Sequence, residues 1–299
     1  MTDWILSISG TPEGARIASM MAIWAAFLHA VFGALQKGRH DPWVSRAAID
    51  ACYGLIALPV VLFVVPFPQP HLWPILGGAM AIHILYKLAQ ASTYQRGAYT
   101  VVYPVVRGTA PLITIIAAGL FFHERYNLAQ WSGVLLLVSG ILGLALYNWR
   151  KLTVGRETLL PALGWALITG VMVAAYTTYD AWGIRQAADP FTFLFWFFLL
   201  DSLFMPLITW RRVALLPAAE LPGLAARGLI GALVAFCSFG AIMLATRIDE
   251  VGRAAVLRET STVFAALVGW IILGEKVGPR RAGLMAMIAA GALIVEYAA

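Results

Sequence analysis

Long apolar runs, separated by short polar links, follow one another along the whole chain and constrain its fold more than any other feature. A helix needs about 20 mostly apolar residues to cross the hydrocarbon core of a bilayer. Ten stretches meet that requirement: 17–37, 43–65, 72–94, 98–121, 128–149, 158–182, 190–210, 222–246, 251–273 and 279–297. Runs this long and continuous predict helices rather than the strands of a barrel. We therefore expect an all-α integral membrane protein with ten transmembrane helices.

The distribution of charge supports the same reading. Only 12% of the 299 residues are charged, whereas a soluble domain carries about 25%, so little chain remains for a soluble domain. The net charge of +6 does not indicate a nucleic-acid partner, because most Lys and Arg lie in short links at the ends of apolar runs, where they set orientation. Counting these basic residues places both termini on the outer side of the inner (plasma) membrane.

The sequence contains no pattern that indicates catalysis or a cofactor. Cys52 and Cys237 both fall inside apolar runs and lack the spacing of metal ligands. No glycine-rich phosphate loop and no nucleophile–base pair is present. We therefore expect no enzymatic activity, no cofactor and no metal site.

An internal repeat divides the chain into two halves, 1–150 and 151–299. One constant offset of 151 residues aligns Arg96 with Arg247, Arg107 with Arg258, and Glu124 with Glu275. Each half holds five apolar runs. Because five is odd, the second half must cross the membrane in the opposite sense, which predicts an inverted-topology repeat. That organisation is typical of alternating-access carriers, whose binding site lies between the halves near the membrane midplane.

Three charged residues lie deep inside apolar runs. Arg107 is about nine residues into its run, or about 14 Å along a helix, close to the centre of a core ~30 Å thick. Arg258 and Glu259 lie at a similar depth in a later run. A charge at this depth costs ~2.5–3.5 kcal/mol, so it normally faces a partner or a wet cavity. Either these residues form an ion pair that locks the halves together, or they handle substrate or protons. We expect Glu259 to meet Lys87, Arg107 or a substrate cation.

A polar stripe runs along the third apolar run. His83, Lys87, Gln90 and Tyr94 follow the spacing i, i+4, i+7, i+11, which places them on one face of a helix. The second half has no matching stripe. The stripe either lines a cavity or packs against another helix, and Lys87 could hold a carboxylate or phosphate there.

Five further residues allow two interpretations each. Tyr99 and Tyr103 are predicted to form aromatic walls of a cavity or to serve in packing. Asp201, alone among Phe and Leu, either accepts a proton or pairs with a neighbouring helix. Glu124 and Glu275 follow the fourth and ninth runs, where a carboxylate caps the next helix or pairs with a basic residue of the link.

The motifs that flank these charges resemble those of a known family. Residues 103–111 (YPVVRGTAP) with 123–125 (HER), and 257–261 (LRETS) with 273–276 (LGEK), are similar to the junction motifs of the drug/metabolite transporter superfamily, in its ten-helix form built from two EamA-type halves. His123 departs from the glycine of that motif. The resemblance implies an inner-membrane carrier or exporter of small metabolites, often driven by protons or exchange. It gives no substrate.

The basic residues at mid-depth lead to a hypothesis about the substrate. The excess of basic groups at mid-depth, namely Lys87, Arg107 and Arg258, predicts a solute with a carboxylate or other anionic group, such as an amino acid or organic acid. Glu259 could bind an amine or carry a coupled proton. The alternative is a non-transporting scaffold or sensor subunit of the membrane. The expected partners are the metabolite and the bilayer, and the chain is expected to be a monomer or homodimer.

Overall fold

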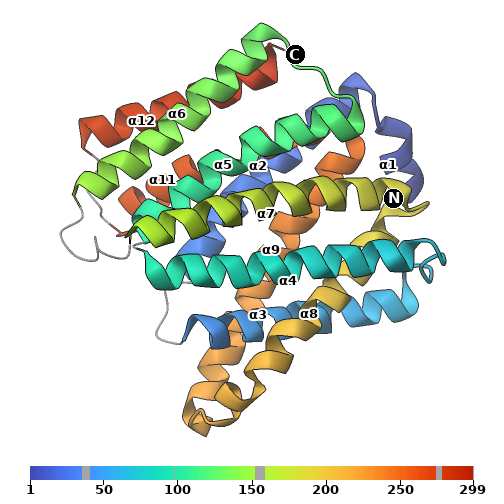
Figure 1. Cartoon of the computed structure of the whole chain (residues 1–299). Helices are drawn as coiled ribbons and strands as arrows, with labels where there is room; N and C mark the ends of the chain where they lie inside the picture. Colours follow the sequence, from blue (N-terminus) through green and yellow to red (C-terminus); the bar gives the residue numbers. More distant parts are fainter. Residues whose placement is uncertain (36–40, 98, 152–158, 274–277, 299) are drawn as a thin grey trace.

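A computed structural model describes residues 1–35, 41–97, 99–151, 159–273 and 278–298, and this part of the chain is helical throughout, with short links (Figure 1). The elements are α1 (Thr2–Ile8), α2 (Pro12–Leu35), α3 (Pro42–Phe63), α4 (Leu72–Arg96), α5 (Tyr99–Phe122), α6 (Leu128–Arg150), α7 (Leu159–Gln186), α8 (Pro190–Ala214), the 3₁₀ turn η1 (Ala218–Glu220), α9 (Leu221–Ile248), α10 (Val251–Arg258), α11 (Ser261–Leu273) and α12 (Pro279–Tyr297). The all-α expectation is confirmed.

The described residues contain eight helices that are long and apolar enough to cross a membrane, so the expected count of ten is not confirmed. The two missing runs both lie in the second half: the apolar run 251–273 is broken into α10 and α11, and the run 279–297 forms α12, which is not among the eight. The hydroxyl of Thr260 donates to the Leu257 carbonyl at 2.6 Å, and that of Thr262 donates to the Glu259 carbonyl at 2.8 Å. Such local hydrogen bonds compete with the backbone hydrogen bonds of a continuous helix. A hydropathy pattern does not predict them.

The first 16 residues contain a short helix ahead of the first long apolar helix. This helix, α1, takes up 7 of them, and its Ile5 and Ile8 are buried in the apolar core. Gly10 then turns the chain with a φ of 73°, a backbone conformation that glycine adopts without strain. Its N–H donates to the Ile248 carbonyl at 3.0 Å, which fixes the turn against the end of α9.

The two halves pack through an exchange of partners. Helix α2 packs on α9, the counterpart of α4, and α4 packs on α7, the counterpart of α2; α3 packs on its own counterpart α8, and α6 on its counterpart α12 (Figure 1). Exchanging the two halves therefore turns the α2–α9 contact into the α4–α7 contact, and it leaves the α3–α8 and α6–α12 contacts unchanged. The interior of the bundle is thus built from both halves, and the residues at its centre come from distant parts of the sequence.

Close backbone contact joins the last helices of the two halves. A Cβ atom placed on Gly291 of α12 would lie 2.5 Å from the carbonyl oxygen of Gly133 in α6. Only glycine permits that approach, as is common for small residues between membrane helices. In Figure 1 the two helices lie side by side along their length.

Candidate functional site

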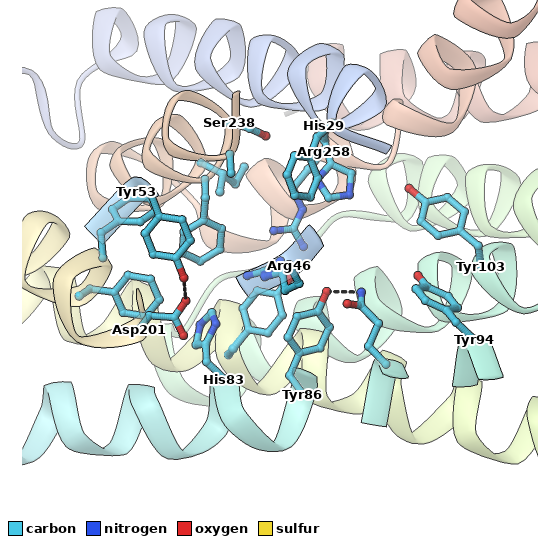
Figure 2. A pocket seen from close by; sticks show the side chains of 18 residues that line it. His29, Arg46, Tyr53, His83, Tyr86, Tyr94, Tyr103, Asp201, Ser238 and Arg258 are labelled. Carbon is cyan, nitrogen blue, oxygen red and sulfur yellow. Dashed lines mark hydrogen bonds between the residues drawn. The ribbon is translucent and has the colours of Figure 1, made fainter. Parts of the chain in front are cut away.

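A cavity of about 120 Å³ lies between the two halves, and its wall is mainly aromatic (Figure 2). Helices α2 to α5 contribute from the first half, and α7 to α10 from the second. Five tyrosines and four phenylalanines line it, so a flat or apolar solute would find matching walls. Polar groups are few and come mostly from His29, Arg46, His83, Asp201 and Arg258.

The cavity extends toward one end of the bundle. Its outer lining residues Gln90, Tyr94 and Tyr103 lie where α4 ends and α5 begins, and they are half-buried. Its inner lining residues His83 and Asp201 are buried, at 5% and 4% exposure. The cavity wall is therefore least buried toward the end of the bundle where α4 ends, which also holds Arg96, Lys151 and Arg212, and we call this end of the cavity its mouth.

Hydrogen bonds between the halves close the opposite end. The Glu124 carboxylate accepts from the N–H groups of Val251 and Gly252, at 2.7 and 3.0 Å, and so caps α10 of the other half. The following helix α6 is capped by Asn127 instead. Burial raises the pKa of Glu124, while the two backbone hydrogen bonds act against that rise. Its counterpart Glu275 lies outside the described residues.

Arg185 strengthens the same closure. Its guanidinium donates to the carbonyls of Thr246 and Asp249 at the end of α9, each at 2.8 Å. The guanidinium also stacks over the ring of Phe122, 4.6 Å from its centroid. One side chain thus joins α7, α9 and the end of α5.

Glu259 lies between two arginines of the repeat. Arg107 Nε is 3.2 Å from Glu259 Oε2, and Arg107 also donates to the Ser261 hydroxyl at 2.8 Å. Arg258 Nε is 4.0 Å from the other oxygen of Glu259, at the limit of an ion pair. Arg107 and Glu259 are 4% and 1% exposed and do not line the cavity, whereas Arg258 does. The interhelical partner of Glu259 is Arg107, one of the three expected from the sequence.

Lys87 lies between two carboxylates. Its Nζ atom is 2.8 Å from Asp50 Oδ2 and 2.9 Å from Asp201 Oδ2. Asp50 also contacts Arg46 at 2.6 Å, and Asp201 accepts a hydrogen bond from the hydroxyl of Tyr53. The cluster joins α3, α4 and α8, and each buried charge has an opposite partner, as burial of charge requires.

His83 pairs with an acid from the other half. Its Nε2 is 2.8 Å from Asp180 Oδ2, which links α4 to α7. Both residues are buried, at 5% and 2% exposure. The imidazole also lines the cavity and packs against the ring of Tyr176, with centroids 4.6 Å apart.

Comparison with known proteins decides the family. Both halves match the model of the EamA-like transporter family, over residues 16–146 and 160–297. The chain belongs to the EamA-like transporter family. A solved structure titled only "Crystal structure of protein" is similar to this EamA-like transporter, with a TM-score of 0.71 and 18% identity over 94% of this chain and 99% of that one. That likeness concerns the fold alone. The comparison with curated proteins gave no match.

The cavity of this EamA-like transporter brings together some of the residues singled out from the sequence. His83, Tyr103, Asp201 and Arg258 line it, together with Gln90 and Tyr94 of the polar stripe. Lys87, from the same stripe, contacts carboxylates and is not part of the cavity wall. Tyr99 begins α5, but its side chain lies outside the described residues.

Sequence reasoning missed three charged residues of the site. Arg46 was not singled out from the sequence, although it lies in the second turn of α3 and lines the cavity. Asp50 and Asp180 were not treated as site residues. Both are carboxylates inside long apolar runs, and the rule that draws attention to Asp201 applies to them equally.

These acids correct the charge count behind the anionic-substrate hypothesis. Lys87, Arg107 and Arg258 do not form a basic excess, because Lys87 contacts Asp50 and Asp201, and Arg107 contacts Glu259. Asp180 adds a further acid beside His83. Any argument for an anionic solute in this EamA-like transporter must therefore rest on Arg258 itself rather than on a sum of charges.

Proposed function

We propose that this membrane transporter is a secondary active carrier of a small amphipathic metabolite that bears a carboxylate or another anionic group. It works by alternating access between two inverted halves of the chain. Its partners are the metabolite and the bilayer, and the mechanism requires one chain. The proposal places the protein in the inner membrane, with the cavity mouth on the cytoplasmic side and both termini outside.

The observation that carries the substrate class is the environment of Arg258. This arginine lines the cavity, and its contacts with protein groups are long: 4.0 Å to Glu259 and 3.5 Å to the Thr177 hydroxyl. Glu259 is closer to Arg107, at 3.2 Å. A guanidinium with loosely held partners favours a carboxylate, because the two planar groups form paired, charge-assisted hydrogen bonds.

The aromatic wall supports the amphipathic body of the substrate. The ring of Tyr176 lies under Arg258, with the guanidinium carbon 5.9 Å from its centroid, and Phe197 and Phe239 line the cavity beside it. A solute with a ring or short apolar chain would pack on these faces while its anionic end reaches Arg258.

Alternating access has support at the two ends of the bundle. One end is closed by two contacts. Glu124, after α5, caps α10, and Arg185 of α7 binds the end of α9. The other end holds the half-buried mouth of the cavity. A carrier with a central site needs one closed and one open end in each state.

A ring-matched ligand series tests the substrate class. Purified protein in detergent is heated with phenylacetate, phenylacetamide or 2-phenylethylamine, which differ in the charge at one end. A ligand at 100 times its Kd stabilises the folded state by about 2.7 kcal/mol, so the acid should raise Tm and the amide and amine should not. Arg258→Gln should remove the effect of the acid, while Arg211→Gln, at the exposed end of α8, should keep it.

Counterflow in liposomes then tests transport with the acids that stabilise the protein. Preloaded vesicles should take up labelled acid faster than protein-free vesicles, and Arg258→Gln should slow that uptake. Equal stabilisation by acid, amide and amine would overturn the anionic group. Stabilisation without counterflow would favour a sensor instead of a carrier.

A further inference from the structure

The pair of His83 and Asp180 is a second chemical feature of the cavity. Unlike the arginine–carboxylate pairs, it contains an imidazole, which can be neutral or carry one extra proton. The imidazole lines the cavity, while Asp180 lies behind it on α7. Asp180 Oδ1 has no hydrogen-bond partner among the described residues, so the interaction with His83 is the main compensation for this buried carboxylate.

With Asp180 ionised, the hydrogen bond decides which nitrogen can take up a proton. An ionised carboxylate only accepts hydrogen bonds, so His83 Nε2 carries the hydrogen that points to Asp180. In the neutral ring, Nδ1 then holds the free lone pair and receives the next proton. Protonation turns a polar contact into a buried ion pair. Loss of that proton leaves the Asp180 charge compensated by one neutral hydrogen bond.

One aromatic ring separates His83 from Arg258. The Tyr176 ring packs against His83, with centroids 4.6 Å apart, and it lies 5.9 Å from the Arg258 guanidinium carbon. An anionic group bound to Arg258 therefore adds a negative charge close to His83 inside a low-dielectric cavity. Opposite charges attract strongly in such surroundings, so the bound anion and a proton on His83 stabilise each other.

Two other buried acids, Glu259 and Asp201, form ion pairs with an arginine and a lysine. Glu259 contacts Arg107 at 3.2 Å and lies outside the cavity wall. Asp201 contacts Lys87 at 2.9 Å and accepts from Tyr53. The charged or titratable groups that line the cavity with His83, or that pair with residues of its wall, come from α2, α3, α4, α5, α7, α8 and α10: His29, Arg46, Tyr53, Tyr86, Lys87, Tyr94, Tyr103, Tyr176, Asp180, Asp201 and Arg258.

We propose that His83 is the proton-binding site of this carrier, and that it takes up one proton from water in the cavity when an anionic group binds Arg258. Substrate and proton then cross the membrane together. Because they move in the same direction, an inward proton gradient drives uptake of the solute, in contrast to the export that the family resemblance implies. This proposal rests on the proposed function, since it requires an anion at Arg258.

Proton uptake on ligand binding tests the proposal directly. Phenylacetate is added to the purified protein in weakly buffered detergent solution between pH 6 and 8, with a pH-sensitive dye present. The ligand stays ionised in this range, because a carboxylate of ordinary pKa near 4 has already lost its proton. We expect proton uptake on binding, and an affinity that falls by up to about tenfold per pH unit between pH 6 and 8, because binding of the anion and of one proton are linked.

Two variants and one control isolate the residue. His83→Gln should bind phenylacetate without proton uptake and with little pH dependence. Asp180→Asn removes the ion-pair partner, so uptake should move to lower pH; this variant also serves if His83→Gln does not fold. His71→Gln changes a histidine at the start of the same helix, outside the cavity, and should behave like the wild type.

The outcomes separate this inference from the proposed function. If phenylacetate binds but no proton is taken up, or if His83→Gln takes up as many protons as the wild type, the role of His83 is overturned while the anion site stands. If phenylacetate does not bind at any pH, both ideas fall. Proton uptake that is lost in His83→Gln and retained in His71→Gln supports the inference.

Discussion

Lys87 is the shared cation of two buried carboxylates, one from each half of the chain. Its ammonium group lies within 3 Å of both Asp50 and Asp201, at 2.8 and 2.9 Å. Lys87→Met would leave two buried carboxylates near each other without their shared cation. Removing one partner of a buried ion pair costs about 3–5 kcal/mol, so we expect a loss of this size in the free energy of unfolding. Unfolding in mixed detergent, followed by tryptophan fluorescence, measures it.

A double variant and a surface control complete that test. Lys87→Met with Asp201→Asn removes a cation and an anion together, so it should lose less stability than Lys87→Met alone. Lys151→Met changes an exposed lysine, where such a charge contributes only about 0–1 kcal/mol. If Lys87→Met unfolds like the Lys151 variant, the buried cluster does not stabilise the fold.

The same residues show what a single sequence can and cannot predict about this site. The depth of Arg107, Arg258 and Glu259 in apolar runs could be predicted, because hydropathy measures it directly. Their partners could not all be identified, because Arg107 meets Glu259 only through packing of α5 against α10, more than 150 positions apart in the sequence. Asp50 and Asp180 could have been found as buried acids, although their pairing with Lys87 and His83 is tertiary information.

At the scale of helices, the sequence predicts how long an apolar helix is better than it predicts where a helix is interrupted. The eight long apolar helices match runs that hydropathy identifies. The break between α10 and α11 was not predicted, because it depends on hydroxyl groups that bond back to the chain at Thr260 and Thr262. The break places Arg258 at the end of α10, where the arginine lines the cavity.

The contact between α6 and α12 gives a prediction about helix packing. A Cβ atom at Gly291 would lie 2.5 Å from the Gly133 carbonyl oxygen and 2.6 Å from the Leu137 nitrogen, both backbone atoms that cannot rotate away. Overpacking of this kind costs about 1–3 kcal/mol, so Gly291→Ala should lower the free energy of unfolding despite the better helix propensity of alanine. Thermal unfolding in detergent checks this.

Helix α12 supplies its own control. Gly283 has no atom within 4 Å of a Cβ position. Gly283→Ala should leave stability unchanged or raise it by up to about 1 kcal/mol, since alanine favours the helix. Equal effects of the two substitutions would mean that the tight α6–α12 contact does not limit packing.

At the scale of the whole molecule, the mouth of the cavity lies at the end of the bundle that holds the basic residues Arg96, Lys151 and Arg212 of the links. The contacts of Glu124 and Arg185 hold the other end closed. If the basic links face the cytoplasm, as their charge indicates, water from that side should reach the wall of the cavity. Gln90 is the best reporter, because it lines the cavity near the mouth and is half-buried.

Cysteine labelling tests both the cavity and the orientation. In a protein whose own Cys52 and Cys237 are replaced by serine, Gln90→Cys should react with a membrane-impermeant thiol reagent applied to inside-out vesicles, and only slowly in right-side-out cells. Thr114→Cys, in the adjoining helix and 1% exposed, should stay unreactive from both sides. Reaction of Gln90→Cys only from the outer side would reverse the orientation while keeping the cavity. No reaction from either side would mean that water does not enter it, and the carrier proposal would lose its binding site.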